Sequence, residues 1–247
     1  MVKAINYEVG DIMKATIEQP TYLSWAGYYG MMDMSDIFVF YDDVQFFRQS
    51  WQQRNKIKSA NGNWMWLTVP VFQKYGQKIN EVKINNVVNW RRKHWESIYQ
   101  SYNKAPYFKQ YRDDIERIYQ SEWGYLSDWN IFIILIVSGL LGIKMPKLVK
   151  SSELKGLVGN KTDRLLQVLD RIGADEYITS YGTKVYIDPQ KFKDRNIKLR
   201  WYEYRPPVYH QVKGEFFPFM SALDLLFNTG EEALRYIREG VHLEENV

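Results

Sequence analysis

The sequence predicts an α/β fold in which a mostly parallel sheet is combined with a helical insertion. Short apolar runs of strand length alternate with helical patterns near both ends of the chain. The run Asp36–Tyr41 is continuously apolar between its ends, as expected for a strand buried on both faces. Between about residues 89 and 143 the apolar spacing is helical instead. We therefore expect one domain spanning residues 1–247, with a helical insertion at about 89–143.

The first elements predict a compact β-α-β unit followed by further strands. Pro20 ends the first strand, and Pro70 stands near the end of the third, where a missing N–H is tolerated. In chain order we expect a strand at 14–18, a helix at 25–34 and strands at 36–41, 64–71 and 78–84.

The second half of the chain predicts the helical insertion and then a return to the α/β pattern. Gly173 is placed to end a helix as a C-terminal cap, and the acidic tail from His242 is expected to fray. We expect helices at 90–102, 107–119, 126–141, 162–172, 220–228 and 231–239, with strands at 176–180 and 197–204.

Composition bounds the chemistry that the chain can perform. A 45% hydrophobic and 25% charged composition supports a core of normal size. The absence of cysteine excludes disulfides, thiolate nucleophiles and cysteine-ligated metals, and three histidines argue against a multi-histidine metal site. Carboxylate-bound Mg²⁺ remains open. A net charge of +4 favours an anionic small molecule over a long nucleic acid.

Localisation is predicted from apolar segments. The N-terminus, Met1–Glu8, lacks the apolar run of a signal peptide. The uninterrupted apolar part of the longest candidate, Ile131–Val137, is too short to cross a bilayer and is expected to lie in a buried helix. We therefore expect a cytoplasmic protein without a transmembrane segment, and the sequence leaves its oligomeric state open.

The predicted functional surface is the polar and aromatic segment from Gln19 to Lys56. In open α/β sheets, ligands bind beyond the carboxyl ends of the strands. The first expected strand is followed there by Gln19 and Tyr22, and the second by a dense polar cluster. From these two strand ends we select as candidate ligand contacts Gln19, Tyr22, Trp25, Gly27, Gln45, Arg48, Arg54 and Asn55.

Each residue type at these strand ends has a plausible task and a plain structural alternative. Asp42 and Asp43 can bind Mg²⁺, or one of them can act as a general base, but such a pair also caps turns. Arg48 and Arg54 can bind a phosphate through paired hydrogen bonds, or they can simply neutralise the charge of the two aspartates. Tyr22 and Trp25 can stack on a ring, or pack in the core.

Three further features are candidates outside that segment. His94 is a possible catalytic base, although a lone histidine on an apolar helix face is more often a packing residue. The loops Tyr181–Thr183 and Tyr209–Gln211 can project polar groups into the same crevice or be ordinary turns. Phosphate-binding glycine motifs and a nucleophile-elbow serine are absent from the sequence.

Motifs along nearly the whole chain resemble the WbqC-like protein family. The resemblance begins with Gln19–Tyr28, Asp36–Phe46 and Trp51–Ile57. It continues with Trp66–Val71, Trp90, His94, Tyr102, Lys104–Phe108, Ser151–Leu154, Lys161–Leu165, Tyr209–Gln211 and Ser221–Asn228. Two positions depart from the family pattern: Ser24 stands where proline is usual, and Thr179–Thr183 replaces a Ser-Gly-Pro-Gly-like loop. The second departure weakens the assignment of a ligand contact to that loop.

The resemblance implies a cytoplasmic enzyme of bacterial surface-polysaccharide (O-antigen, lipopolysaccharide) biosynthesis, acting on an activated sugar. It adds weight to the candidate residues at matching motif positions, which are Gln19, Tyr22, Asp42, Asp43, Gln45, Arg54, Asn55, His94 and Gln211. The first hypothesis is a transferase that modifies a nucleotide- or carrier-linked sugar. The alternatives are an acyl or aminoacyl transferase for an amino sugar, and a non-catalytic sugar- or nucleotide-binding partner in a biosynthetic complex.

The first strand-to-helix turn also resembles that of Rossmann-like nucleotidylyltransferases, which carry His-x-Gly-His there. The histidines are absent, and Tyr28 occupies the position of the second. The resemblance therefore implies a Rossmann-like, distantly nucleotidylyltransferase-like fold, without the imidazole chemistry.

Overall fold

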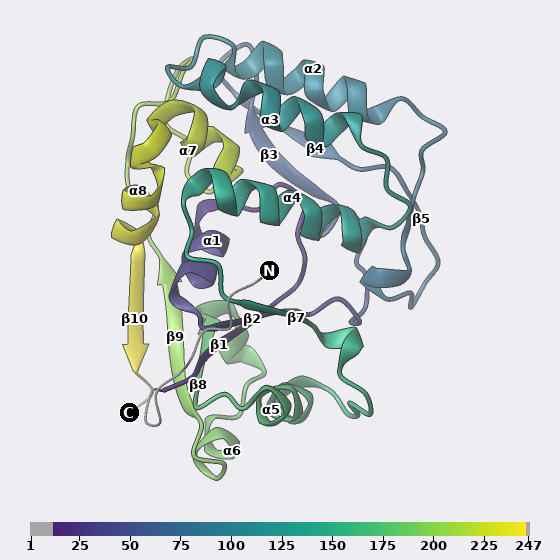
Figure 1. The fold of residues 1–247 in the computed structure, drawn as a ribbon, viewed down its shortest axis with the longest axis vertical. Coiled ribbons are helices and arrows are strands. Elements are labelled where there is room, and N and C mark those ends of the chain that lie inside the picture. Colours follow the sequence, from purple (N-terminus) through teal and green to yellow (C-terminus); the bar gives the residue numbers. More distant parts are fainter. Residues whose placement is uncertain (1–11, 246–247) are drawn as a thin grey trace, which may run out of the picture.

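A computed structural model describes residues 12–245, and the predicted absence of a signal peptide, which concerns Met1–Glu8, falls outside them. The described chain forms a six-stranded sheet in the order β10-β9-β8-β1-β2-β7 (Figure 1). All neighbours in this sheet are parallel except β10, which runs antiparallel to β9. This confirms the mostly parallel, Rossmann-like α/β class. The strands are β1 (Lys14–Glu18), β2 (Ile37–Phe40), β7 (Lys147–Lys150), β8 (Glu176–Ser180), β9 (Lys198–Tyr204) and β10 (Val241–Glu245).

Helices cover both faces of the sheet. Figure 1 shows α5 and α6 on one face, with α1, α4, α7 and α8 on the other and α2 and α3 beyond them. None of the described helices is both long and apolar enough to cross a membrane. The helices are α1 (Ala26–Met34), α2 (Trp90–Tyr102), α3 (Phe108–Gln120), α4 (Leu126–Leu141), α5 (Lys161–Ile172), α6 (Pro189–Lys193), α7 (Ala222–Thr229) and α8 (Ala233–Glu239).

Alternation along the strands assigns each side chain to one face. In β1, Ala15 and Ile17 belong to the core shared with α5 and α6. Thr16 points the other way, because its hydroxyl accepts a hydrogen bond from Ser35, just beyond α1. The next residue on that second face is Glu18, which therefore leaves the sheet on the side of α1.

The path of the chain creates a switch point beside β1. It runs from β1 through β2 to β7 at one edge, and then returns across the sheet to place β8 on the other side of β1. Connections leave β1 and β8 in opposite directions at this point, so a crevice opens beyond their carboxyl ends.

The connection from β2 to β7 departs from the predicted strands. The range 64–71 forms β4 (Trp64–Thr68), which pairs with β3 (Arg54–Lys58) in a separate two-stranded sheet. The expected edge strand at 78–84 is mostly wrong, since Ile79–Glu81 is a 3₁₀ turn and only β6 (Lys83–Ile84) pairs, with β5 (Val71–Phe72). The strand β3 was not predicted from the sequence, because its outward residues, such as Arg54 and Lys56, are charged and the segment Gln19–Lys56 is polar overall.

The prediction of a frayed tail from His242 is also wrong within the described residues. Val241–Glu245 forms β10 and pairs with the full length of β9. The tail alternates in period two, with Val241 and Leu243 packed against Met31 and Tyr202 and with His242 and Glu244 exposed. The acidic composition of the tail led to the prediction of a frayed end. The alternation is nevertheless sufficient for an edge strand, because β9 provides the strand with which it pairs.

Candidate functional site

The crevice at the switch point consists of two adjoining cavities that share Gln19, Tyr41, Leu165 and Tyr186. The Glu18 compartment, of about 360 Å³, lies beyond β1 and β8. The Arg164 compartment, of about 670 Å³, lies beside it at the beginning of α5. Together they have the size and the mixed polar and aromatic lining of a small-molecule site.

Glu18 is the last residue of β1, the strand in contact with both β2 and β8. Its carboxylate has no hydrogen-bond or ion-pair partner among residues 12–245, and it remains partly exposed through the cavity. Burial raises the pKa of Glu18 to about 7, because the surrounding protein cannot solvate the charged form. Such a carboxyl group can both accept and release a proton near neutral pH.

Tyrosines surround Glu18 in its compartment. Burial raises the pKa of Tyr28 and of Tyr177 well above the usual value, and the neighbouring Glu18 charge raises both further. The pKa of Tyr186 is likewise raised to about 12, mainly by burial. These phenols therefore remain protonated near neutral pH, when they can donate hydrogen bonds, and their rings supply apolar walls.

The Arg164 compartment contains the cations of the crevice. Arg164 contacts Asp43 through a 2.5 Å pair between Nη2 and Oδ2 and lies over the Tyr41 ring. Burial lowers the pKa of Arg164, but the hydrogen bond to the Asp43 carboxylate, its negative charge and the neighbouring Tyr41 phenol raise the pKa overall. Lys161 lines the same compartment at the first turn of α5. A group carrying negative charge is therefore accommodated more readily here than in the Glu18 compartment.

Asp42, predicted as a base or Mg²⁺ ligand, is buried in a hydrogen-bonded turn. Its Oδ1 accepts from the Ser152 backbone N–H at 3.0 Å, and its Oδ2 accepts from the Ser152 hydroxyl at 2.7 Å. The Ser151 hydroxyl lies 2.5 Å from Asp43 Oδ1 and 3.1 Å from Asp42 Oδ1. Residues 12–245 contain no group of three or more histidine, aspartate or glutamate side chains placed so that they could hold a metal ion. These contacts fit a structural turn better than a Mg²⁺ site.

Several other predicted contacts do line the crevice. Gln19 borders both compartments and accepts a hydrogen bond from the Gln52 side chain at 2.7 Å. Trp25 and Asn55 border the Glu18 compartment, and Asn55 also donates to the Leu23 carbonyl at 2.8 Å, which holds the loop after β1. Gln45 borders the Arg164 compartment together with Asp43.

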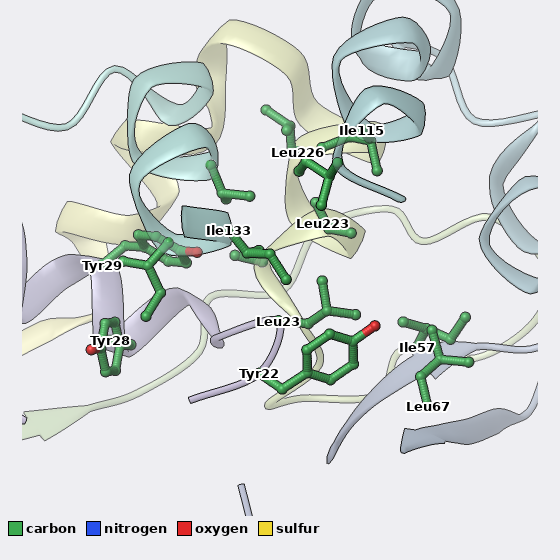
Figure 2. Packing of buried hydrophobic residues seen from close by; sticks show 14 of the residues in the cluster. Tyr22, Leu23, Tyr28, Tyr29, Ile57, Leu67, Ile115, Ile133, Leu223 and Leu226 are labelled. Atoms are coloured by element: carbon green, nitrogen blue, oxygen red, sulfur yellow. The ribbon is translucent and has the colours of Figure 1, made fainter. Parts of the chain in front are cut away.

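Tyr22 and His94 lie on the opposite side of the loop, inside the helical layer. The Tyr22 hydroxyl lies 2.8 Å from His94 Nδ1 and 2.8 Å from the Tyr119 hydroxyl, and the ring is fully buried (Figure 2). Burial lowers the pKa of His94 to about 4, so its imidazole is neutral near pH 7. Neither residue lines the crevice, and their contacts are those of packing residues.

The remaining predicted contacts also lie outside both compartments. Arg54 stacks on Trp66, with its guanidinium carbon 4.2 Å from the ring centroid. Gln211 is buried and closes its own loop through two hydrogen bonds to the backbone of Phe217. Arg48 is exposed beyond the crevice lining, and Gly27 packs beneath Trp25, where a Cβ would lie 2.2 Å from the indole.

Sequence reasoning did not select Glu18, Arg164 or Tyr186. Of the loop Tyr181–Thr183, it is Thr183 that reaches the Glu18 compartment, beside Ser180. The available signal for Glu18 was a carboxylate at the carboxyl end of a short strand, directly before Gln19 and Pro20. Arg164 belongs to the motif Lys161–Leu165, but its position one turn into α5 gave no specific signal for a ligand contact, because amphipathic helices expose many arginines.

Comparison with known proteins supports the resemblance drawn from the motifs. The sequence model of the WbqC-like protein family matches residues 19–236. The chain belongs to the WbqC-like protein family. It is 34% identical over 229 residues to "Uncharacterized protein Rv1507c" of Mycobacterium tuberculosis, which covers 91% of this chain and 97% of that protein. No solved structure matches the chain.

Proposed function

We propose that this WbqC-like protein is a transferase that modifies a nucleotide- or carrier-linked sugar during assembly of bacterial surface polysaccharide such as O-antigen. The observation that carries the proposal is the unpartnered Glu18 carboxyl group at the switch-point crevice, with a pKa of about 7. Perturbed carboxyl groups without structural partners concentrate at functional sites. The family resemblance supplies the class of substrate.

The two compartments suit the two substrates of such a transfer, the activated donor and the acceptor. Lys161 and Arg164, the latter already paired with Asp43, would supply positive charge for the phosphate of the activated donor. Glu18 faces the other compartment, where an acceptor hydroxyl or amine would bind. Donor and acceptor would then meet at the residues that both compartments share, near Gln19 and Tyr41.

The proposed transfer is a substitution at a carbon of the activated donor. The acceptor oxygen or nitrogen forms a new bond to that carbon while its proton passes to the Glu18 carboxylate. The bond from the same carbon to the leaving phosphate oxygen breaks, and its electron pair departs with the phosphate. Glu18 then releases the proton to solvent. Glu18 thus acts as the general base, and Arg164 and Lys161 bind the anionic phosphate.

The first experiment is a thermal-shift screen against nucleotides, nucleotide-sugars and acyl carriers, with and without Mg²⁺. We expect a nucleotide-sugar to raise the melting temperature of the wild type, since a ligand that binds only the folded state stabilises it. Stabilisation by acyl carriers alone would favour the acyl-transfer alternative. If no nucleotide-sugar stabilises the protein, the proposal is wrong.

Turnover measurements then separate catalysis from binding. With the stabilising donor and a set of candidate acceptors, Glu18→Gln is expected to keep donor binding and to lose transfer. Asp42→Asn and Asp43→Asn test the base assignments made from sequence. Loss of transfer in Asp43→Asn with normal transfer in Glu18→Gln would overturn the role of Glu18. Donor binding without transfer in the wild type, with all acceptors, would favour the non-catalytic binding partner.

A further inference from the structure

Tyr28 and Tyr29 are adjacent on α1 and alike in burial, yet they face different surroundings. Both residues are at least 98% buried, at 2% and 0% exposure. The Tyr28 hydroxyl has no hydrogen-bond partner in the described structure, whereas the Tyr29 phenol interacts with the Ser24 side chain. Figure 2 shows the two rings leaving α1 in different directions. Tyr28 lines the Glu18 compartment, whereas Tyr29 borders neither compartment of the crevice.

An unpartnered buried hydroxyl is costly, and its position beside a cavity suggests a missing partner. Glu18 leaves β1 on the face of α1, which also carries Tyr28, and its charge raises the pKa of the Tyr28 phenol. Tyr28 nevertheless donates no hydrogen bond to Glu18 in the described structure. One hydroxyl donor and one carboxylate acceptor therefore belong to residues that line the same compartment.

The other residues of the Glu18 compartment narrow the class of ligand. Glu18 is the one charged side chain among its described lining residues, which include no lysine, arginine or histidine. A phosphate or carboxylate would thus meet repulsion and no counter-charge. Trp25, Trp51 and Tyr177 supply aromatic surfaces, while Ser180 and Thr183 add hydroxyl groups. Aromatic walls with sparse polar groups suit a neutral, polyhydroxylated ring.

We propose that the Glu18 compartment binds the acceptor as a neutral sugar ring, with one ring hydroxyl donating to Glu18 and a neighbouring hydroxyl accepting from Tyr28. This inference rests on the proposed transferase function and assigns its two substrates to separate compartments. Tyr28 is a residue that determines specificity and position, because it selects a ring with hydroxyls on adjacent carbons. It takes no proton during the transfer.

Saturation-transfer NMR tests this subsite with methyl glycosides of glucose, galactose, mannose and N-acetylglucosamine, without any nucleotide. We expect at least one glycoside to bind the wild type. Tyr28→Phe should weaken that binding by about tenfold, as expected for the loss of one hydrogen bond to the ligand. Tyr29→Phe is the matched control, since it removes an equally buried hydroxyl outside the crevice and should bind as the wild type does.

Two results would overturn the subsite. In the first, no glycoside binds the wild type; in the second, Tyr28→Phe binds the glycosides as well as Tyr29→Phe. Both results are distinguishable from failure of the transferase proposal. Stabilisation by a nucleotide-sugar with transfer to an acceptor would still establish the transferase, while the sugar-ring subsite at Tyr28 would be wrong. Both variants should melt cooperatively, since each keeps the aromatic ring.

Discussion

Glu18 in the crevice and Asp224 in the helical layer are both buried carboxyl groups with raised pKa, but only one of them has partners. Asp224 accepts hydrogen bonds from Tyr102 at 2.9 Å and Tyr209 at 2.8 Å, and no exposed surface remains. Burial raises its pKa to about 6 against the opposing effect of these hydrogen bonds. Glu18 has no such partners and opens into a cavity. A satisfied buried carboxylate holds structure together, whereas an unsatisfied one beside a cavity is available for chemistry.

The tyrosines of the two regions show the same contrast. In the helical layer, Tyr102 and Tyr209 both donate to Asp224, and the Tyr22 hydroxyl is shared with His94 and Tyr119. In the crevice, the Tyr28 hydroxyl is left without a partner. These tyrosines of the helical layer therefore contribute hydrogen bonds to stability, whereas the crevice leaves the Tyr28 hydroxyl free.

The largest expected effect is on turnover. Glu18→Gln should lower kcat by at least about a hundredfold, the usual contribution of a general base. Asp224→Asn, at the satisfied site, should leave kcat per folded molecule unchanged within a few-fold. Steady-state kinetics with the donor identified by thermal shift, combined with circular dichroism, would measure both. Equal losses in the two variants would remove the functional distinction between the two carboxyl groups.

Stability should respond in the opposite order. Asp224→Ala leaves the buried hydroxyls of Tyr102 and Tyr209 unpaired and should lower the free energy of unfolding by about 4 kcal/mol. Glu18→Ala leaves no buried donor without its partner and should cost much less. Urea unfolding at pH 7 would compare the two variants. A similar loss in both would mean that Glu18 also has a structural role.

The pH dependence of stability provides a sharper test of Glu18. The folded-state pKa of Glu18, about 7, lies above the ordinary value of 4.5. Protonated Glu18 therefore makes its full favourable contribution to the free energy of unfolding below pH 4.5, and this contribution is lost as the pH rises through 7. The free energy of unfolding of Glu18→Gln minus that of the wild type should therefore grow between pH 4.5 and 7.5, by about 3 kcal/mol at most. Urea unfolding at pH 5 and pH 8 would measure this difference, and a constant difference would contradict the raised pKa. The kcat/KM of the wild type should rise with pH through about 7.

The smallest expected effect is a gain in stability. Tyr28→Phe removes a buried hydroxyl that has no partner, so it should raise the free energy of unfolding by about 1 kcal/mol. Tyr29→Phe removes a hydroxyl that interacts with Ser24, so its gain should be smaller. Differential scanning calorimetry of the ligand-free proteins would detect the higher melting temperatures. A loss of stability in Tyr28→Phe would show that its hydroxyl has a hydrogen-bond partner. Only Tyr28→Phe should combine the gain with weaker sugar binding.

Local sequence patterns predicted most of the fold. The helix α4 was placed at its observed bounds, and Gly173 ends α5 in the left-handed region at φ 69°, as a C-terminal cap requires. The strand β8 was also placed at its observed bounds. The errors at β3 and β10 occurred where charged residues occupied the exposed face of a short strand. There the pairing partner, not the local composition, stabilises the strand.

The candidate site was less accessible from the sequence than the fold. Strand-end reasoning led to Gln19, Asp43 and Gln45, which do line the crevice, since the carboxyl ends of parallel strands meet at one edge. It could not distinguish Asp42 from Glu18 as the available carboxylate. Asp42 is bound by Ser151 and Ser152, which follow it by more than 100 residues. A hydrogen-bond partner so distant in the chain leaves no local signature.

By itself, the sequence determined the α/β class and membership of the WbqC-like family, and it predicted the edge of the sheet at which we propose that a ligand binds. These follow from periodicity, strand ends and motifs, which are local properties of the chain. Only the tertiary structure decided which polar side chains at that edge are free. Glu18 and Tyr28 remain unpartnered beside the cavity, while Asp42, Tyr22 and His94 are bound by distant elements. Whether a buried polar group is satisfied depends on all the elements packed around it, and therefore on the completed fold.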